Sequence, residues 1–287
     1  MIRVQNLYHD YEGKGSFAVN DVSFEVPAGS IYGFLGPSGS GKSTVQNILT
    51  KLLALQQGTV SYEDVPLHEI HPSFFNRVGY SFELPNLYTK LTGLENLRLH
   101  AGLFSVPTED PRRVLDMVGL ADAAHRKTAQ YSKGMKQRLS FARAIINQPD
   151  LLFLDEPMSG LDPTTAARIK TIIAEKRASG VTIFMTTHNM YTADELCDQV
   201  AFLNNGRIIA ADTPRNLKLA YGEKSVRIEY AADDTSASFR TDTLFLDRED
   251  DRRRFLALTE AGRVETVHSQ EASLEQIFVR LTGRGLS

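Results

Sequence analysis

The chain is poor in cysteine and has no long apolar run. Only one of its 287 residues is a cysteine, Cys197, so a disulfide framework within the chain is excluded and a reducing compartment is expected. No stretch of about 18 apolar residues occurs, which predicts that this chain does not itself cross a membrane. Internal repeats and low-complexity segments are also absent.

The overall charge does not point to a strongly charged partner. The formal net charge is −3 at pH 7, without the basic excess that favours nucleic acid, so no nucleic-acid partner is expected. Hydrophobic residues make up 42% of the chain, which is enough for a sizeable core. Length and composition together predict one large domain and one small domain.

A glycine-rich loop stands between a predicted strand and a predicted helix. The strand-like residues 31–35 (IYGFL) precede the loop, and the helical pattern TVQNILTKLLAL follows it. The loop sequence GPSGSGKST matches GxxxxGK[ST], in which backbone N–H groups surround phosphate oxygens and a helix N-terminus favours negative charge. We therefore predict that the phosphates of a nucleotide contact Gly36, Pro37, Ser38, Gly39, Ser40, Gly41, Lys42, Ser43 and Thr44.

Two acidic residues follow an apolar segment further along the chain. Residues 151–154 (LLFL) have the length and composition of a buried parallel strand, and Asp155 and Glu156 stand at its carboxyl end. Taken alone, such a pair is as readily a solvated acidic turn as a functional site. Beside the glycine loop, however, Asp155 and the hydroxyl of Ser43 are predicted to hold one Mg²⁺ ion, with Asp155 acting through water.

Strands and helices alternate along most of the chain. Strand character marks 18–26, 58–65, 77–82, 181–186 and 200–203, and helical character marks about 91–146, 164–176 and 191–197. Asn205-Gly206 indicates a hairpin. The alternation predicts an α/β fold of the P-loop NTPase type, with a mostly parallel core sheet, an antiparallel β subdomain and a helical insertion at about 91–146.

The pattern changes near residues 221–224, where the periodic core ends. Short strand-like segments follow, and the last helix has apolar residues at i, i+3, i+4 and i+7, namely Leu274, Ile277, Phe278 and Leu281. Ser273 and Gln276 form a capping-box pattern before this helix, and Gly283 is a suitable stop. We therefore expect an ATP-binding domain at 1–221 and a C-terminal accessory α+β domain at 222–287.

The remaining motifs occur in a fixed order over about the first 220 residues. Besides the glycine loop and the acidic strand, the chain carries YSKGMKQRL from Tyr131, SGLDP up to Pro163, and His188 after the strand-like VTIFMTT. In this order the motifs resemble those of the ATP-binding subunits of ABC transporters. The C-terminal SLEQIFVRLTGR resembles that of the ABC-2 type subfamily of drug and polysaccharide exporters, whose membrane subunits are separate chains.

The resemblance implies a role for several side chains. Glu156 would be the general base or water-polarising carboxylate of ATP hydrolysis, and His188 would donate to the γ-phosphate. Asp162 would bridge a dimer interface, although an aspartate before a proline is also a typical helix N-cap. Tyr11 would stack on adenine, although Tyr8 is nearby and either of the two could be merely a packed strand aromatic.

The segment from Tyr131 to Met135 departs from the LSGGQ signature of that family. Tyr131 replaces leucine and Lys133 replaces a glycine, while Ser132 and Gly134 are retained and should keep their contact with ATP. The Lys133 ammonium either assists phosphate binding or stays in solvent. Because the phosphate loop and the signature of one subunit face apart in this family, the resemblance implies a head-to-tail homodimer in which Ser132 closes the other subunit's ATP.

Glu83, in GYSFELP, stands where the family usually has a glutamine that binds Mg²⁺ and reports to the membrane subunit. Glutamate keeps an oxygen ligand and adds a charge. This charge would help to hold Mg²⁺ but would repel the γ-phosphate and Glu156, by up to about 4 kcal/mol per pair at about 4 Å. We therefore expect Glu83 to stand back from the metal until the dimer closes, and still to couple ATP to transport.

Together with the resemblance, the motifs predict an ATP-hydrolysing subunit of an exporter. It would use ATP and Mg²⁺, lie at the cytoplasmic face of the cell membrane as a peripheral protein, and drive a separate polytopic membrane subunit. The first alternative is a soluble cassette ATPase acting on a ribosome or another nucleoprotein, a class that usually carries two cassettes in one chain. The second is a small-molecule kinase, in which the signature motif would have no purpose.

Overall fold

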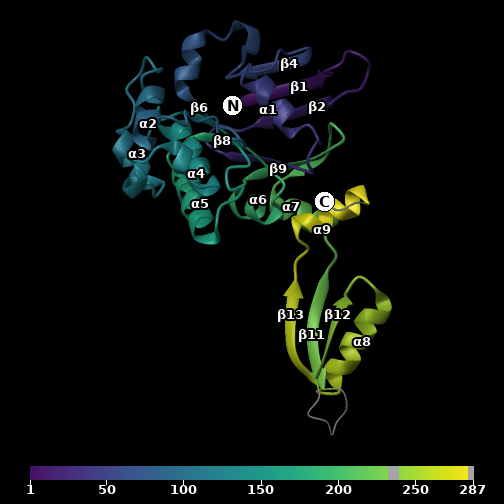
Figure 1. The fold of residues 1–287 in the computed structure, drawn as a ribbon. Helices are drawn as coiled ribbons and strands as arrows, with labels where there is room; N and C mark the ends of the chain where they lie inside the picture. The colour runs from purple at the N-terminus through teal and green to yellow at the C-terminus, as the bar shows by residue number, and fades with distance from the viewer. Residues whose placement is uncertain (232–238, 284–287) are drawn as a thin grey trace. The chain divides into compact units, whose positions relative to one another are not determined.

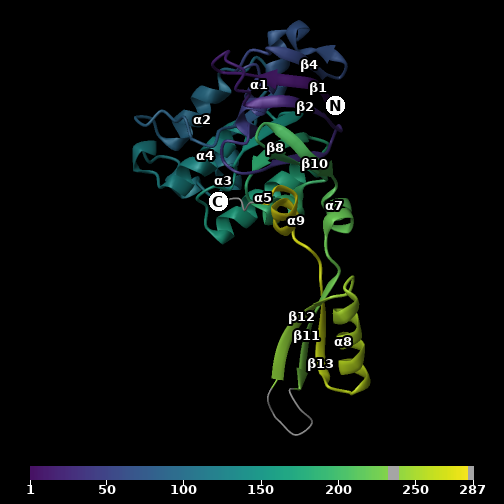
Figure 2. The ribbon, with the colours of Figure 1, turned by 90° about the vertical axis from the view of Figure 1, so that its right-hand side faces the viewer.

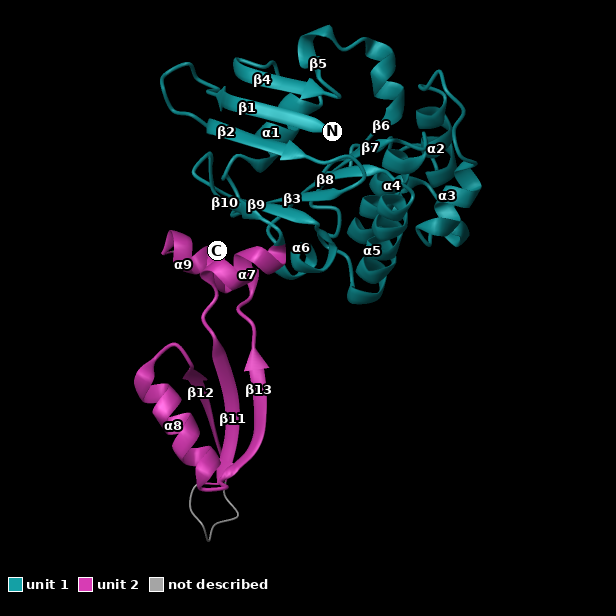
Figure 3. Cartoon of the chain, turned by 180° about the vertical axis from the view of Figure 1, so that it is seen from behind, with its two compact units in different colours: residues 1–213, 286–287 teal, residues 214–285 magenta. Residues whose placement is uncertain are grey.

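The computed structural model describes residues 1–231 and 239–283. The chain forms two compact units: residues 1–213 build the first, and the second begins at Pro214 (Figure 3). Within the described residues, the helices are all too short or too polar to span a bilayer. The first unit contains two sheets and the second contains one, and each unit has its own core.

A six-stranded sheet forms the centre of the first unit. Its strand order is β10 (Arg207–Asp212), β9 (Gln199–Asn204), β3 (Ile31–Leu35), β8 (Thr182–Thr187), β7 (Leu151–Asp155) and β6 (Val78–Ser81). All neighbours are parallel except β10, which returns from β9 through the predicted Asn205-Gly206 turn. Every residue of β3, β7 and β8 is buried, as expected for parallel strands covered on both faces.

An antiparallel sheet accompanies it, in the order β2 (Val19–Val26), β1 (Ile2–His9), β4 (Gln57–Tyr62) and β5 (Val65–Pro66). The sequence predicted β2 but not β1. It also predicted one strand over 58–65, which is wrong, because Glu63 and Asp64 adopt positive φ angles of 50° and 68° and turn the chain back on itself. The predicted antiparallel β subdomain is thus present, with two more strands and one more turn than expected.

Layers on both faces bury the parallel sheet (Figures 1 and 2). The antiparallel sheet and α1 (Lys42–Leu49) cover one face, and α4 (Lys133–Ile145), α5 (Pro163–Ala178) and α6 (Met190–Leu196) cover the other. Phe24 of β2 lies 4.7 Å from Phe34 of β3, and Phe34 lies 5.0 Å from Phe184 of β8, measured between ring centroids. Fully buried aromatic rings thus join the two sheets into one core.

The segment between β6 and β7 is helical, as predicted. It contains α2 (Gly93–Ala101), α3 (Pro111–Met117), α4 and two 3₁₀ turns, Ala121–Ala123 and Thr128–Gln130. Two further 3₁₀ turns, Leu67–Glu69 and Pro72–Arg77, precede β6. The α2 helix begins at a reciprocal cap between Thr92 and Glu95, which satisfies two backbone N–H groups of its first turn.

The second unit contains a three-stranded antiparallel sheet in the order β12 (Phe239–Phe245), β11 (Ser225–Ala231) and β13 (Val264–Gln270). One face packs against α8 (Glu249–Glu260) around Ile228 and Leu244, and α7 (Pro214–Tyr221) packs with α9 (Leu274–Thr282). Ser273 and Gln276 cap α9 reciprocally, and Gly283 ends it at φ 67°, as the sequence predicted.

Candidate nucleotide-binding site

The glycine loop runs from the carboxyl end of β3 to the start of α1 and lies directly against the backbone of neighbouring segments. A Cβ atom on Gly36 would come within 2.1 Å of the Leu203 carbonyl oxygen, and one on Gly41 within 2.4 Å of the Ala18 carbonyl oxygen. Gly41 also has a φ of 105°. These two positions therefore require glycine for steric reasons.

Lys42 lies inside the loop. Its ammonium donates to the carbonyl oxygens of Gly36 at 2.7 Å and Pro37 at 2.9 Å. Burial lowers the pKa of Lys42, and the charges of Glu156, Asp155 and Glu83 counteract part of that effect. The Lys42 ammonium is a suitable donor to the phosphates of a nucleotide, whereas the three carboxylates add negative charge that a divalent cation would have to offset.

Asp155 and Ser43 converge from different elements. The Ser43 hydroxyl donates to Asp155 Oδ1 at 3.4 Å, and Thr186 of β8 donates to the same oxygen. Burial raises the pKa of Asp155, while the hydrogen bonds from Thr186 and Ser43 lower it. Their oxygens are hard donors of the kind that Mg²⁺ prefers. The described residues contain no group of three His, Cys, Asp or Glu side chains that could hold a metal, so water and phosphate oxygens would have to complete the coordination.

Glu156 follows at the end of β7, with a positive φ of 45° that is uncommon for a residue other than glycine. Its Oε2 accepts a hydrogen bond from the Thr187 hydroxyl at 3.0 Å. Its Oε1 accepts from both the backbone N–H and Nδ1 of His188, each at 2.7 Å. The end of β8 thus holds the Glu156 carboxylate from two sides and places His188 in direct contact with it.

Tyr11 lies at the rim of this site. Its hydroxyl is 3.1 Å from Thr44 Oγ1 of α1, and its side chain is 61% exposed. The preceding Asp10 accepts hydrogen bonds from the backbone N–H groups of Glu12 and Gly15, at 2.9 and 2.6 Å, and so folds the loop that carries Tyr11. Tyr11 is therefore exposed rather than packed in the core, with its ring in edge-on contact with the His9 ring at 4.6 Å between centroids.

These residues surround one open cleft of about 360 Å³, a volume suited to a small ligand. It lies entirely within the first unit. The lining residues are Tyr11, Ala18, Ser38, Gly39, Gly41, Lys42, Ser43, Thr44, Glu83, Asp155, Glu156 and His188. The structure therefore brings together the phosphate loop, Glu83, both acidic residues and the histidine that the sequence singled out. Sequence reasoning missed Thr186 and Thr187, although the TT before His188 was visible.

The signature residues and Asp162 lie outside this cleft. Ser132 caps α4, with its Oγ accepting from the Met135 N–H at 3.2 Å. The Lys133 stem lies against the SGLDP turn, since a Cβ on Gly160 would come within 3.0 Å of Lys133 Cε. Asp162 caps α5 and accepts from the Thr165 N–H at 3.0 Å, so the N-cap interpretation is correct and leaves an interface role open.

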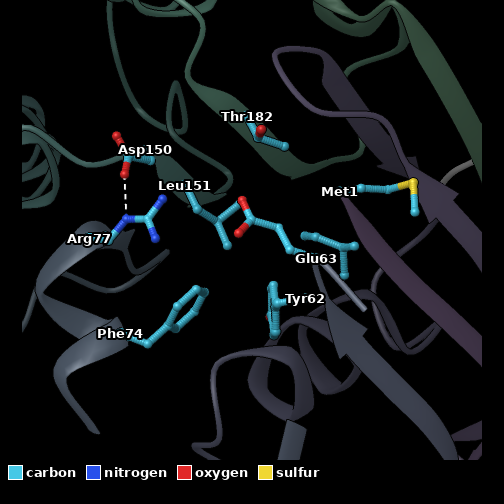
Figure 4. A pocket seen from close by; sticks show the side chains of 9 residues that line it. Met1, Tyr62, Glu63, Phe74, Arg77, Asp150, Leu151 and Thr182 are labelled. Carbon is cyan, nitrogen blue, oxygen red and sulfur yellow. Dashed lines mark hydrogen bonds and ion pairs between the residues drawn. The ribbon is translucent and has the colours of Figure 1, made fainter. Parts of the chain in front are cut away.

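A smaller cavity, of about 40 Å³, lies at the amino-terminal end of the parallel strands (Figure 4). Leu151 and Thr182, the first residues of β7 and β8, line it together with an ion pair between Arg77 and Asp150, whose nitrogen and oxygen are 2.5 Å apart. The glycine loop follows the opposite, carboxyl end of β3. The smaller cavity is therefore separate from the nucleotide cleft, and none of the residues singled out above lines it.

Comparison with known proteins agrees with this geometry. The ABC transporter family matches residues 19–159. A fluoroquinolones export ATP-binding protein of Mycobacterium tuberculosis (strain ATCC 25618 / H37Rv) is 49% identical over 287 residues, which cover 100% of this chain and 95% of the relative. The daunorubicin/doxorubicin resistance ATP-binding protein of Streptomyces peucetius is 33% identical over 300 residues, which cover 94% of this chain and 89% of the relative.

Solved structures show the same fold. An ATP-binding subunit of an ABC transporter aligns with a TM-score of 0.69 at 29% identity, over 77% of this chain and 93% of the other. A dimeric post-hydrolysis cassette bound to ADP and Pi aligns with a TM-score of 0.68 at 25% identity, over 74% and 98%. The predicted α/β P-loop fold is confirmed, and the relatives favour an exporter over a soluble cassette ATPase. The chain belongs to the ABC transporter family and is an ATP-binding, ATP-hydrolysing subunit of the export type.

Proposed function

We propose that two copies of this chain form a head-to-tail dimer that closes on two ATP molecules and powers export through a separate polytopic membrane subunit. The observation that carries the proposal is that the phosphate loop and the signature of one copy lie in different places. Lys42, Asp155 and Glu156 line one cleft, whereas Ser132 caps α4 outside it, so a second molecule has to supply the signature contact. Asp162, at the start of α5, would lie at the dimer interface. A related cassette bound to ADP and Pi is dimeric.

Each ATP would contact both subunits. The exposed ring of Tyr11 would stack on adenine, and the loop from Gly36 to Thr44 would bind the phosphates. The other copy would contribute Ser132 and Gly134 to the γ-phosphate. The Lys133 ammonium would lie beside them, and the described residues of its own subunit offer it no ion pair. In this arrangement residues 1–221 act as the ATP-binding domain and residues 222–287 as an accessory domain.

Glu156 would accept the proton of the attacking water. The water oxygen bonds to the γ-phosphorus while the bond to the ADP oxygen breaks, which yields ADP and inorganic phosphate. Hydrogen bonds from Thr187 and His188 occupy both carboxylate oxygens of Glu156. We therefore infer that His188 turns its ring donor toward the γ-phosphate when ATP binds, which frees one carboxylate oxygen for the water.

Ser43, Asp155 and Glu83 would hold Mg²⁺. All three line the cleft and present hard oxygen donors, and the Ser43 and Asp155 oxygens are already close together. When bound, the ion would neutralise charge on the β- and γ-phosphates. Burial lowers the pKa of Lys42, and the charge of Glu83 opposes this effect together with the larger contributions of Glu156 and Asp155.

The membrane subunit would dock beside the Glu83 loop, at the cytoplasmic face of the membrane. Large apolar side chains are exposed there: Leu84 by 75%, Tyr88 by 59%, Leu99 by 44% and Leu103 by 73%. They lie on the loop after Glu83, on α2 and just beyond it. A grouping of exposed apolar side chains is typical of a protein interaction site.

The cargo would be a drug-like molecule. The basis is the full-length relative at 49% identity that is named for fluoroquinolones export, together with the relative named for daunorubicin and doxorubicin resistance. Selection among such molecules would lie in the membrane subunit. Transport into membrane vesicles that contain both subunits is the direct assay, and failure of ATP to drive uptake of any such drug would contradict this assignment.

We expect Glu156→Gln to bind ATP, to lower the rate of hydrolysis by about 100-fold or more, and to accumulate as an ATP-bound dimer. The amide keeps the size of the side chain but cannot accept the proton from water. Size-exclusion chromatography with and without ATP measures the dimer, and phosphate release measures hydrolysis. Glu175→Gln, on the exposed surface of α5, is the matched control and should behave as the parent. Near-normal turnover in Glu156→Gln would contradict the assigned role.

For Glu83→Gln we expect the Mg²⁺ concentration that supports half-maximal ATP hydrolysis to rise about fivefold. The change removes one negative charge beside the metal and keeps an oxygen donor. The free energy of Mg²⁺ binding should therefore become less favourable by about 1 kcal/mol. Mg²⁺ titration of nucleotide binding provides a second readout, and Glu175→Gln again serves as control. If Mg²⁺ dependence and transport are both unchanged, the charge of Glu83 has no special role.

The docking surface predicts a variant that separates ATP binding from membrane association. Leu84→Asp combined with Leu103→Asp should reduce the amount of polytopic protein recovered with this chain from detergent-solubilised membranes by about tenfold. ATP binding should persist, because neither residue lines the cleft. Leu52→Asp, at a position 56% exposed elsewhere, is the matched control. Equal recovery with the parent and the double variant would exclude this surface.

A further inference from the structure

Tyr131, the residue before Ser132, is built into the helical insertion. Its side chain is only 4% exposed, and its hydroxyl donates to the carbonyl oxygen of Ala123 at 2.6 Å. A leucine, which the family has at this position, would have no such donor. Ser132 itself is exposed, and its side chain is held by its cap to the Met135 N–H. The buried tyrosine is therefore an anchor directly beside the exposed residue that would contact ATP.

Gly93, the first residue of α2, provides the space for this ring. A Cβ on Gly93 would come within 2.2 Å of the Tyr131 hydroxyl oxygen and within 3.2 Å of Tyr131 Cζ. Gly93 is buried, and its φ is not positive, so the need for glycine here comes from the tyrosine rather than from the backbone conformation. Gly93 and Tyr131 thus form a complementary pair, called here the glycine-tyrosine pair.

The glycine-tyrosine pair lies between the Glu83 loop and the signature. On one side, the loop is tied to α2 because Asn96 Oδ1 accepts from the Tyr88 N–H at 3.0 Å. On the other side, the Thr128 hydroxyl donates to the Tyr88 carbonyl oxygen at 2.9 Å, just before the signature. Tyr131 completes the connection by packing on the start of α2. These contacts connect the Glu83 loop, through α2 and Thr128, to the segment that carries Ser132.

We propose that Tyr131, through its contact with Gly93 and its hydrogen bond to Ala123, is a positioning residue that sets Ser132 and Gly134 for closure over the other subunit's ATP. This inference rests on the proposed head-to-tail dimer. Ser132 is the exposed N-cap of α4. Its position therefore depends on the buried contacts of the adjacent residue, Tyr131. Small misplacements of a contact group cost large factors in rate, on the order of 100-fold for about 1 Å.

Four variants made in the Glu156→Gln background test the inference. Tyr131→Phe removes only the hydroxyl, and Tyr131→Leu introduces the residue that the family has at this position. Gly93→Ala places a methyl group against the Tyr131 ring. In the double variant, Gly93→Ala with Tyr131→Leu, the smaller leucine leaves room for that methyl group. The ATP concentration for half-maximal dimer formation is measured by size-exclusion chromatography. Binding of a fluorescent ATP analogue to the monomer is measured in parallel, because it depends on the subunit's own phosphate loop.

We expect Tyr131→Phe to require about fivefold more ATP for dimer formation, since a buried hydrogen bond is lost, with unchanged binding to the monomer. Gly93→Ala should lose most dimer formation, and Tyr131→Leu added to it should recover a large part. Without the Glu156 change, Tyr131→Phe should lower kcat and leave monomer affinity as it is.

The inference is overturned if Tyr131→Phe and Tyr131→Leu both form the dimer at the parental ATP concentration. It is equally overturned if dimer formation and monomer affinity fall together, which would indicate a role in folding alone. Should Gly93→Ala not fold, Tyr131→Phe decides the matter, because it adds no atom. Failure of the parental Glu156→Gln protein to form any dimer with ATP would contradict the proposed function instead.

Discussion

Charge buried at the carboxyl end of the parallel sheet is the constraint on which the site depends. Lys42, Asp155 and Glu156 lie together at the ends of β3 and β7, and each is less than a tenth exposed. Burying charges is costly unless they are paired and hydrogen-bonded, and here the loop carbonyls, Thr186 and Thr187 provide those partners. The surrounding fold supplies the rigidity. Aromatic packing between two sheets fixes the strand ends, and the phosphate loop is pressed against neighbouring backbone at glycine positions.

Under the proposed dimer, one copy holds only part of each ATP site. The cleft contains a cation for phosphates, oxygen donors for a metal and a carboxylate for water, all on one face. The signature lies on a separate helix, with its serine exposed and its preceding tyrosine buried. In the proposed dimer, each copy would bind one ATP with its cleft and contact the other copy's ATP with its signature. Association of two copies would then depend on the nucleotide, which is the coupling that an ATP-driven exporter requires.

Much of this was predictable from sequence because the motifs combine residue type with local context. GPSGSGKST, the acids after LLFL and the cap at Ser273 all depend on neighbours within a few residues. Other features depend on residues distant in sequence. The turn at Glu63 and Asp64 lies in a run that also fits a single strand, and β1 becomes evident only through its pairing with β2 and β4. The contact between Gly93 and Tyr131 has no sequence pattern at all, since a glycine that provides space for a distant ring looks like any other glycine.

The central claim, that each ATP is held by the phosphate loop of one copy and the signature of the other, is tested most directly by mixing two inactive variants. Lys42→Ala lacks the phosphate-loop cation and Ser132→Ala lacks the signature hydroxyl. In a mixed dimer, one site carries both lesions and the other carries none. The account predicts that neither variant alone hydrolyses ATP efficiently, and that an equimolar mixture regains hydrolysis. A mixture as inactive as its two components would contradict the account, because it would mean that both elements act on ATP within one copy.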